Sequence, residues 1–127
     1  MVSGLDHVQV AAPPASEQEA RRFYGALLGL EEIPKPPTLA RRGGAWFALA
    51  DGRQLHLGVT DGFAAATKAH PAFRVRGLAE LRARLMAAGV LTRDEEPLEG
   101  ASRFYADDPF GNRLEFLERD APARPEA

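Results

Sequence analysis

The strongest constraint on the fold is that one order of expected elements runs twice along the chain. Gly29 and Gly89 end the two expected helices, and most equivalent positions in the two halves lie 59 to 63 residues apart. Alternating or helical spacing of apolar residues predicts a strand at 5–11, a helix at 17–28 and strands at 30–33, 45–50 and 53–59, then a strand at 70–75, a helix at 78–88 and strands at 90–93, 102–107 and 113–118. A repeat of this kind predicts a duplicated βαβββ unit.

Local signals mark the ends of several elements. Ser16 followed by Glu19 is typical of a capping box at the start of the first helix. Asp51-Gly52 is a hairpin turn signal, and residues 109–112 predict a turn before the last strand. We therefore expect one α+β domain at residues 1–118, with modules at about 4–60 and 69–118 and a flexible tail at 119–127.

Composition excludes several classes of function. The net charge of −2 implies no basic face, so nucleic acid is not an expected partner. The absence of cysteine excludes disulfides and thiolate ligands. We see no signal peptide and no apolar run that could span a bilayer, and we expect a cytoplasmic protein that binds no membrane.

The three histidines of the chain and one glutamate are the candidate metal ligands. His7, His56, His70 and Glu115 each fall at the start of an expected strand or within one, two in each half. Alternation turns His7, His56 and Glu115 away from the apolar neighbours that face the helices. A curved sheet could gather the four groups around one divalent ion on its concave side. The alternative for each histidine alone is a hydrogen-bonded core or surface residue.

Four segments carry a resemblance to a known family. The last of them contains the motif Asp-Pro-x-Gly-Asn-x-x-Glu, at residues 108–115. The chain resembles the vicinal oxygen chelate superfamily, which contains glyoxalases, bleomycin resistance proteins and extradiol dioxygenases, up to about residue 118. The segments are Leu5-Asp6-His7-Val8, Phe23-Tyr24-Gly25-Ala26-Leu27-Leu28-Gly29-Leu30, His70-Pro71-Ala72-Phe73 and the stretch from Phe104 to Glu115.

The resemblance implies a fold and a metal site. The fold is two βαβββ modules that form a curved mixed β-sheet with helices on its outer face. Ligands on the first and fourth strands of each module correspond to His7, His56, His70 and Glu115. Glyoxalases and epimerases usually have Glu or Gln where this chain has His56. The identity of the metal therefore remains undecided among Zn, Ni, Mn and Fe.

The function that the resemblance implies is a metal-dependent reaction of glyoxalase type. The ion would bind a small-molecule substrate through two adjacent oxygens, in lyase, isomerase or resistance-transferase chemistry. The alternatives are a non-catalytic protein that binds a small molecule such as an antibiotic, a ring-cleaving dioxygenase, which requires redox-active iron, and a scaffold with a structural ion.

The remaining candidate residues have two interpretations each. Glu115 is expected to be catalytic as well as a ligand, with a histidine as the alternative proton carrier. Tyr105 either hydrogen-bonds a substrate oxygen or is a core or rim aromatic. Trp46 is expected to pack in the core, with contact to a substrate as the alternative. Arg103 is expected to be a solvated charge, with anion binding as the alternative. Arg113 is expected to point to solvent, with orientation of the Glu115 carboxylate as the alternative.

Assembly follows from exposed sheet edges. Each βαβββ half leaves polar edge groups unpaired, so two halves should pair. In short members of the superfamily, the first module of one chain commonly pairs with the second module of another. This resemblance implies a homodimer whose sites draw ligands from both chains. Pairing within one chain is the alternative, and the linker at 60–69 would decide between them.

Overall fold

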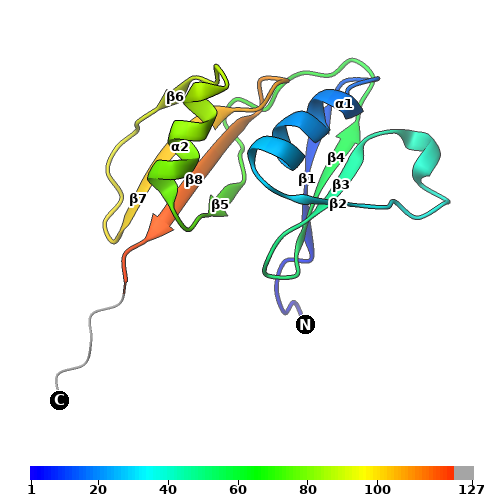
Figure 1. Cartoon of the computed structure of the whole chain (residues 1–127). Helices are drawn as coiled ribbons and strands as arrows, with labels where there is room; N and C mark the ends of the chain where they lie inside the picture. The colour runs from blue at the N-terminus through cyan, green and yellow to red at the C-terminus, as the bar shows by residue number, and fades with distance from the viewer. Residues whose placement is uncertain (122–127) are drawn as a thin grey trace.

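The computed structural model describes residues 1–121, and Figure 1 shows two modules side by side. Among these residues, no helix is long and apolar enough to cross a membrane. The last strand extends to Arg119, one residue further than expected, and most of the expected tail, residues 122–127, lies outside the described residues.

The first module contains four strands and an irregular helix. Its helix begins as α1 and continues as a wider π-helix, η1, which Gly29 ends with a φ of 75°. The elements are β1 (His7–Ala12), α1 (Glu17–Ala20), η1 (Arg21–Leu27), β2 (Glu31–Ile33), the 3₁₀ turn η2 (Ala40–Arg42), β3 (Ala45–Ala48) and β4 (Gln54–Val59).

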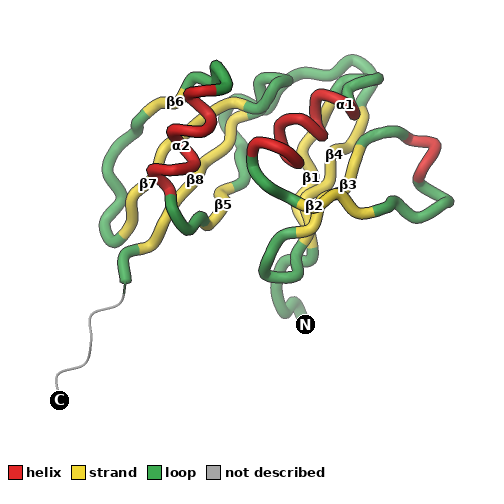
Figure 2. The backbone as a smooth tube through the Cα atoms, viewed as in Figure 1, coloured by secondary structure: helices red, strands yellow, loops and turns green. Residues whose placement is uncertain are grey.

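The second module repeats the order in shorter form. Its elements are β5 (Ala72–Arg74), α2 (Leu78–Ala87), β6 (Thr92–Arg93), β7 (Ala101–Asp107) and β8 (Arg113–Arg119). The linker between the modules contains no helix (Figure 2). Gly89 follows α2 with a φ of 83°, as expected for a residue that ends a helix.

Sheet topology confirms the repeated α+β fold. The strand orders are β1-β4-β3-β2 and β5-β8-β7-β6, so each module has one mixed four-stranded sheet. In both sheets the first strand is parallel to the fourth, and the other neighbours are antiparallel. The first strand of each module, β1 or β5, is therefore an edge strand of its sheet.

Register repeats as well as topology. His56 on β4 lies opposite Trp46 on β3, and Glu115 on β8 lies opposite Tyr105 on β7. A direct cross-strand pair brings two side chains to the same face of the sheet. Each module therefore presents one aromatic residue beside one candidate ligand.

The remaining ligand lies at or just before the first strand of each module: His7 begins β1, whereas His70 precedes β5, so the expected strand at 70–75 is shorter than predicted. Gln9 pairs with His56 and Ala72 pairs with Glu115. His7 and His70 precede those paired residues by two positions, which is one side-chain repeat along a strand. The equivalence of the two modules is therefore an equivalence of hydrogen-bond register.

The start of the first helix differs from the expectation. Ser16 makes no side-chain cap and instead donates from its hydroxyl to the Pro13 carbonyl, so the predicted capping box with Glu19 is wrong. Glu17 accepts from the Gly44 N–H at 2.9 Å, which ties the helix to the loop before β3. Helix position here depends on a tertiary hydrogen bond rather than a local one.

The core is continuous across the two modules. Its largest fully buried side chains are aromatic or aliphatic residues on the helix side of both sheets, and α2 packs on β6, β7 and β8. They are Tyr24, Phe47, Leu55, Leu57, Leu85, Phe104, Leu114 and Phe116.

Polar groups of the closing turn also join the modules. The buried Asp108 accepts from the Tyr24 hydroxyl at 2.7 Å and from the Asn112 amide at 2.9 Å. Asn112 also donates to the Ala11 carbonyl and accepts from the Ala66 N–H. The Asp-Pro-x-Gly-Asn part of the motif is therefore a buried link between the modules, and every polar group named here has a partner.

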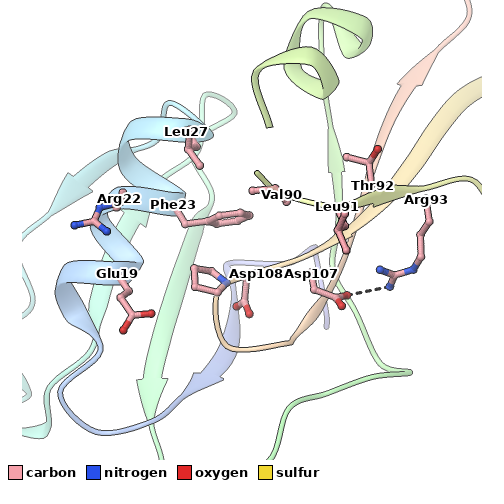
Figure 3. A pocket seen from close by; sticks show the side chains of 11 residues that line it. Glu19, Arg22, Phe23, Leu27, Val90, Leu91, Thr92, Arg93, Asp107 and Asp108 are labelled. Carbon is pink, nitrogen blue, oxygen red and sulfur yellow. Dashed lines mark hydrogen bonds and ion pairs between the residues drawn. The ribbon is translucent and has the colours of Figure 1, made fainter. Parts of the chain in front are cut away.

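A pocket of about 670 Å³ lies between the modules (Figure 3). Phe23 and Leu27 on one side face Val90 and Leu91 on the other, and Arg93 pairs with Asp107 at 2.9 Å. None of the lining residues is a predicted site residue. This pocket is therefore separate from the candidate functional site.

Replacing Tyr24 with Phe tests the link between the modules. The variant loses the hydrogen bond to the buried Asp108, and we expect its free energy of unfolding to fall by about 1–3 kcal/mol at pH 7. Urea denaturation followed by circular dichroism measures this change.

The same variant tests the effect of alkaline pH. Burial, followed by the negative charge and hydrogen bond of Asp108, raises the pKa of Tyr24 well above 10.0. Because the folded state favours the neutral phenol, its contribution is complete below pH 10.0 and is lost as the pH rises through the pKa of the folded protein. Tyr24→Phe should lack this alkaline loss, and Tyr105→Phe should retain it; equal losses in both variants would contradict the assignment.

Candidate functional site

The first half-site is a stack of three rings, Trp46, His56 and His7. The Trp46 and His56 rings are 3.8 Å apart with an interplanar angle of 1°. The His7 ring lies 4.2 Å from the His56 ring at 20°. His56 is 5% exposed, whereas the His7 side chain is 44% exposed. Trp46 is thus half-buried against His56 and does not pack in the core, where the sequence had predicted it.

Hydrogen bonds fix which ring nitrogen is free in each of these histidines. His7 Nδ1 lies 2.9 Å from a carboxylate oxygen of Asp6, which can only accept, so Nδ1 carries the proton and Nε2 is free. His56 has the opposite arrangement, because its Nε2 lies 2.8 Å from the amide oxygen of Gln54. His7 resembles a metal-binding histidine held by a carboxylate.

The second half-site consists of His70, Glu115 and Tyr105. His70 Nε2 is 2.9 Å from Glu115 Oε1, and the Tyr105 hydroxyl donates to the same oxygen at 3.0 Å. Glu115 is 6% exposed and Tyr105 is 4% exposed, so the carboxylate has been removed from most of its solvent. Such a group requires compensating partners.

The chemistry of this pair fits a bound cation. His70 Nδ1 lies 2.9 Å from the Lys68 carbonyl oxygen, an acceptor, and must carry a proton. In the neutral ring Nε2 is then a lone pair that faces a second acceptor, Glu115 Oε1. Two such atoms 2.9 Å apart need either a second proton on the ring or a metal ion. Neighbouring ligands of an octahedral ion, each bonded at about 2.1 Å, would have a similar separation of about 3 Å.

The environment adjusts the pKa of both buried ligand candidates. Burial alone would raise the pKa of Glu115, but hydrogen bonds from His70, Tyr105 and Arg103 outweigh it and lower the pKa below 4.5. Burial also lowers the pKa of His56 below 6.5, and the nearby His7 adds to this effect. Both residues therefore favour the deprotonated forms that bind metals.

Two arginines near Glu115 contradict the expectation of solvated charges. Arg103 donates to Glu115 Oε2 at 3.3 Å and to the Tyr105 hydroxyl at 3.1 Å. The Arg113 guanidinium lies 4.3 Å from the centre of the Tyr105 ring and 3.6 Å from Glu95. Side chains alternate along β7, so Arg103 lies on the same face as Tyr105. This alternation would have predicted from the sequence that Arg103 lies near the site.

The structure brings the four candidate ligands together as two pairs. His7 lies beside His56, and His70 lies beside Glu115. Within residues 1–121, no three His, Cys, Asp or Glu side chains lie close enough together to hold one ion. One chain therefore carries two half-sites, and the predicted four-ligand site stays a prediction that requires the half-sites to meet.

Comparison with known proteins identifies the family. The model of the glyoxalase-like domain matches residues 9–117 of the chain. The chain belongs to this family. Its fold and its structural relatives place it in the vicinal oxygen chelate superfamily. No curated protein matches the sequence.

Solved structures support the same membership. A protein from Bacillus anthracis assigned to the glyoxalase family is 47% identical, with a TM-score of 0.90, and the match covers 94% of this chain and 98% of that one. A glyoxalase/dioxygenase from Nostoc punctiforme is 22% identical, with a TM-score of 0.70 and coverage of 89% and 90%.

A third structure is the fosfomycin resistance protein FosX from Listeria monocytogenes, in complex with Mn(II) and sulfate. It is 22% identical, with a TM-score of 0.73, and the match covers 96% of this chain and 93% of FosX. At this identity the likeness shows a shared fold. A divalent metal therefore occurs within the family's fold.

Replacing Tyr105 with Phe tests the electrostatics of the second half-site. The variant loses one hydrogen bond that stabilises the carboxylate, so we expect the pKa of Glu115 to rise. Carbon-13 NMR titration of glutamate side chains in the metal-free protein measures the shift. The control is Tyr24→Phe, which also removes a buried hydroxyl; the same shift in both variants would refute the assignment.

Proposed function

We propose that this glyoxalase-family protein is a metal-dependent enzyme that acts on a small molecule through two adjacent oxygen atoms. One observation carries the proposal: His70 Nε2 and Glu115 Oε1 face each other at 2.9 Å while the other nitrogen of His70 is committed to a carbonyl. The equivalent residue of the first module, His7, likewise has its Nδ1 committed to an acceptor, and its Nε2 is free. The proposed ligand set is His7, His56, His70 and Glu115, two residues from each module.

The site is completed in a homodimer. The β1 and β5 strands are edges of their sheets, and Leu5 and Val8 expose apolar surface at the β1 edge. Pairing of β1 with β5 of the partner subunit would satisfy both edges and bring a first half-site to a second half-site. A twofold dimer then has two equivalent sites, each with ligands from both chains.

The residues of this chain have distinct roles in the proposed reaction. A bound divalent ion supplies Lewis-acid stabilisation of negative charge on the substrate oxygens. The single hydroxyl proton of Tyr105 bonds Glu115 Oε1, and it would have to leave that oxygen to donate to a substrate oxygen. Proton transfer falls to Glu115 or to a histidine; in the first half-site, His56 Nδ1 and His7 Nε2 are the ring nitrogens without a hydrogen-bond partner among the described residues.

The reaction class is a lyase, isomerase or resistance transferase of glyoxalase type, and the metal is Zn, Ni, Mn or Fe. Ring-cleaving dioxygenation is the alternative if the ion is redox-active iron. A protein that binds a small molecule without turnover is a second candidate, favoured by the flat stack of Trp46 on His56. Metal analysis of the purified protein, followed by activity screens with each ion, separates these possibilities.

Mixing two inactive variants tests the shared site. His7→Ala and His70→Ala should each bind Mn²⁺ weakly, because every site then lacks one ligand. After subunit exchange, a mixed dimer has one site without either histidine and one intact site. Random pairing should restore about a quarter of the wild-type number of tight Mn²⁺ sites, measured by titration calorimetry.

The control is a mixture of His7→Ala with His56→Ala. Both changes lie in the first half-site, so no arrangement of the two chains restores an intact site. Recovery in neither mixture would favour pairing of the modules within one chain. Wild-type Mn²⁺ affinity in both His7→Ala and His70→Ala would refute the proposed metal site itself.

A further inference from the structure

We propose that Arg103 is a positioning residue that keeps Glu115 a one-oxygen ligand and so leaves an extra position on the metal open for the substrate. The inference rests on the proposed function, because it concerns how the same site would hold its ion. It assigns a role to a residue that sequence analysis expected in solvent.

Hydrogen bonds to the Glu96 carbonyl hold the guanidinium of Arg103 on the edge that faces away from Glu115. Its Nε and one terminal nitrogen both donate to the Glu96 carbonyl oxygen, at 3.3 and 2.6 Å. This fork anchors the charged group to the loop between β6 and β7, and the side chain is only 19% exposed. A guanidinium held on one side presents its other edge in a fixed direction.

The free edge of Arg103 points at Glu115. The remaining terminal nitrogen donates to Glu115 Oε2 at 3.3 Å and to the Tyr105 hydroxyl at 3.1 Å. The two oxygens of Glu115 therefore have different partners: Oε2 contacts Arg103, whereas Oε1 contacts His70 and Tyr105. Oε1 is the atom that faces His70 Nε2, the ring nitrogen that would bind the metal.

A carboxylate can bind a metal through one oxygen or through both. An oxygen that already accepts from a guanidinium is held away from that second bond. Every position that Glu115 leaves vacant is available to water or substrate, and a substrate that binds through two oxygens needs two adjacent positions. Arg103 therefore favours the open coordination that the proposed reaction requires.

The test counts water molecules on bound Mn²⁺ by water-proton relaxation. In Arg103→Met, Glu115 Oε2 is free to bind the ion, so we expect the loss of one exchangeable water together with tighter Mn²⁺ binding. Arg103→Lys keeps the positive charge but loses the two hydrogen bonds to the Glu96 carbonyl. We therefore expect fewer water molecules on bound Mn²⁺ in this variant too, although its net charge is that of the wild type. If Arg103→Met does not fold, Arg103→Lys still provides the test.

The matched control is Arg113→Met. Arg113 is a second cation against Tyr105, at 4.3 Å from its ring, and no hydrogen bond or ion pair joins it to Glu115 among the described residues. Its removal should change Mn²⁺ affinity through charge alone and leave the water count at the wild-type value. Circular dichroism and urea denaturation verify that each variant is folded.

The outcomes separate this inference from the proposed function. Wild-type protein that binds none of Zn²⁺, Ni²⁺, Mn²⁺ and Fe²⁺ would overturn the metal site and the role of Arg103 with it. Wild-type binding with an unchanged water count in both Arg103 variants would overturn only the positioning role. A lower count in Arg113→Met as well would show that charge, rather than the contact with Oε2, controls coordination.

Discussion

The parallel pairing of the first and fourth strands, made twice in the same register, supports every other feature of the site. Hydrogen bonds of this ladder place Gln9 opposite His56 and Ala72 opposite Glu115. A slip of one residue would turn the whole strand over, because side chains alternate between the two faces of a sheet. The apolar residues of β4 and β8 oppose such a slip, since they are buried against the helices. Burial on one face therefore fixes the ligands on the other.

The two faces of the sheets have different roles: contacts on the helix side join the modules, and the opposite face carries the candidate ligands. On the helix side, the buried Asp108 joins Tyr24 to Asn112 and so connects one module to the other. On the opposite face, each module holds one imidazole whose Nδ1 is committed to an acceptor and a second candidate ligand beside an aromatic ring. Glu115 remains ionised in spite of burial because three donors compensate for the lost solvent, and their effect lowers its pKa.

Much of the fold could be predicted from the sequence, because periodicity and turn residues are local signals. The strand and helix order, the turn before β8 and the ends of both helices at Gly29 and Gly89 were predicted in this way and are confirmed. The capping box was wrong because the Ser16 hydroxyl donates to the Pro13 carbonyl instead. Arg103 and Trp46 were misjudged for a different reason: they make cross-strand contacts, to Glu115 and His56, and the local sequence carries no information about these contacts.

The sequence by itself determined the repeated unit, the family and the identity of the candidate ligands, because each of these depends on residue types and their spacing along the chain. Only the tertiary structure decided which atoms of those residues meet. Hydrogen bonds to Asp6, Gln54 and Lys68 select the free nitrogen of each histidine, and these bonds require the folded backbone. The division of the ligands into two pairs likewise depends on the separation of the two sheets in space.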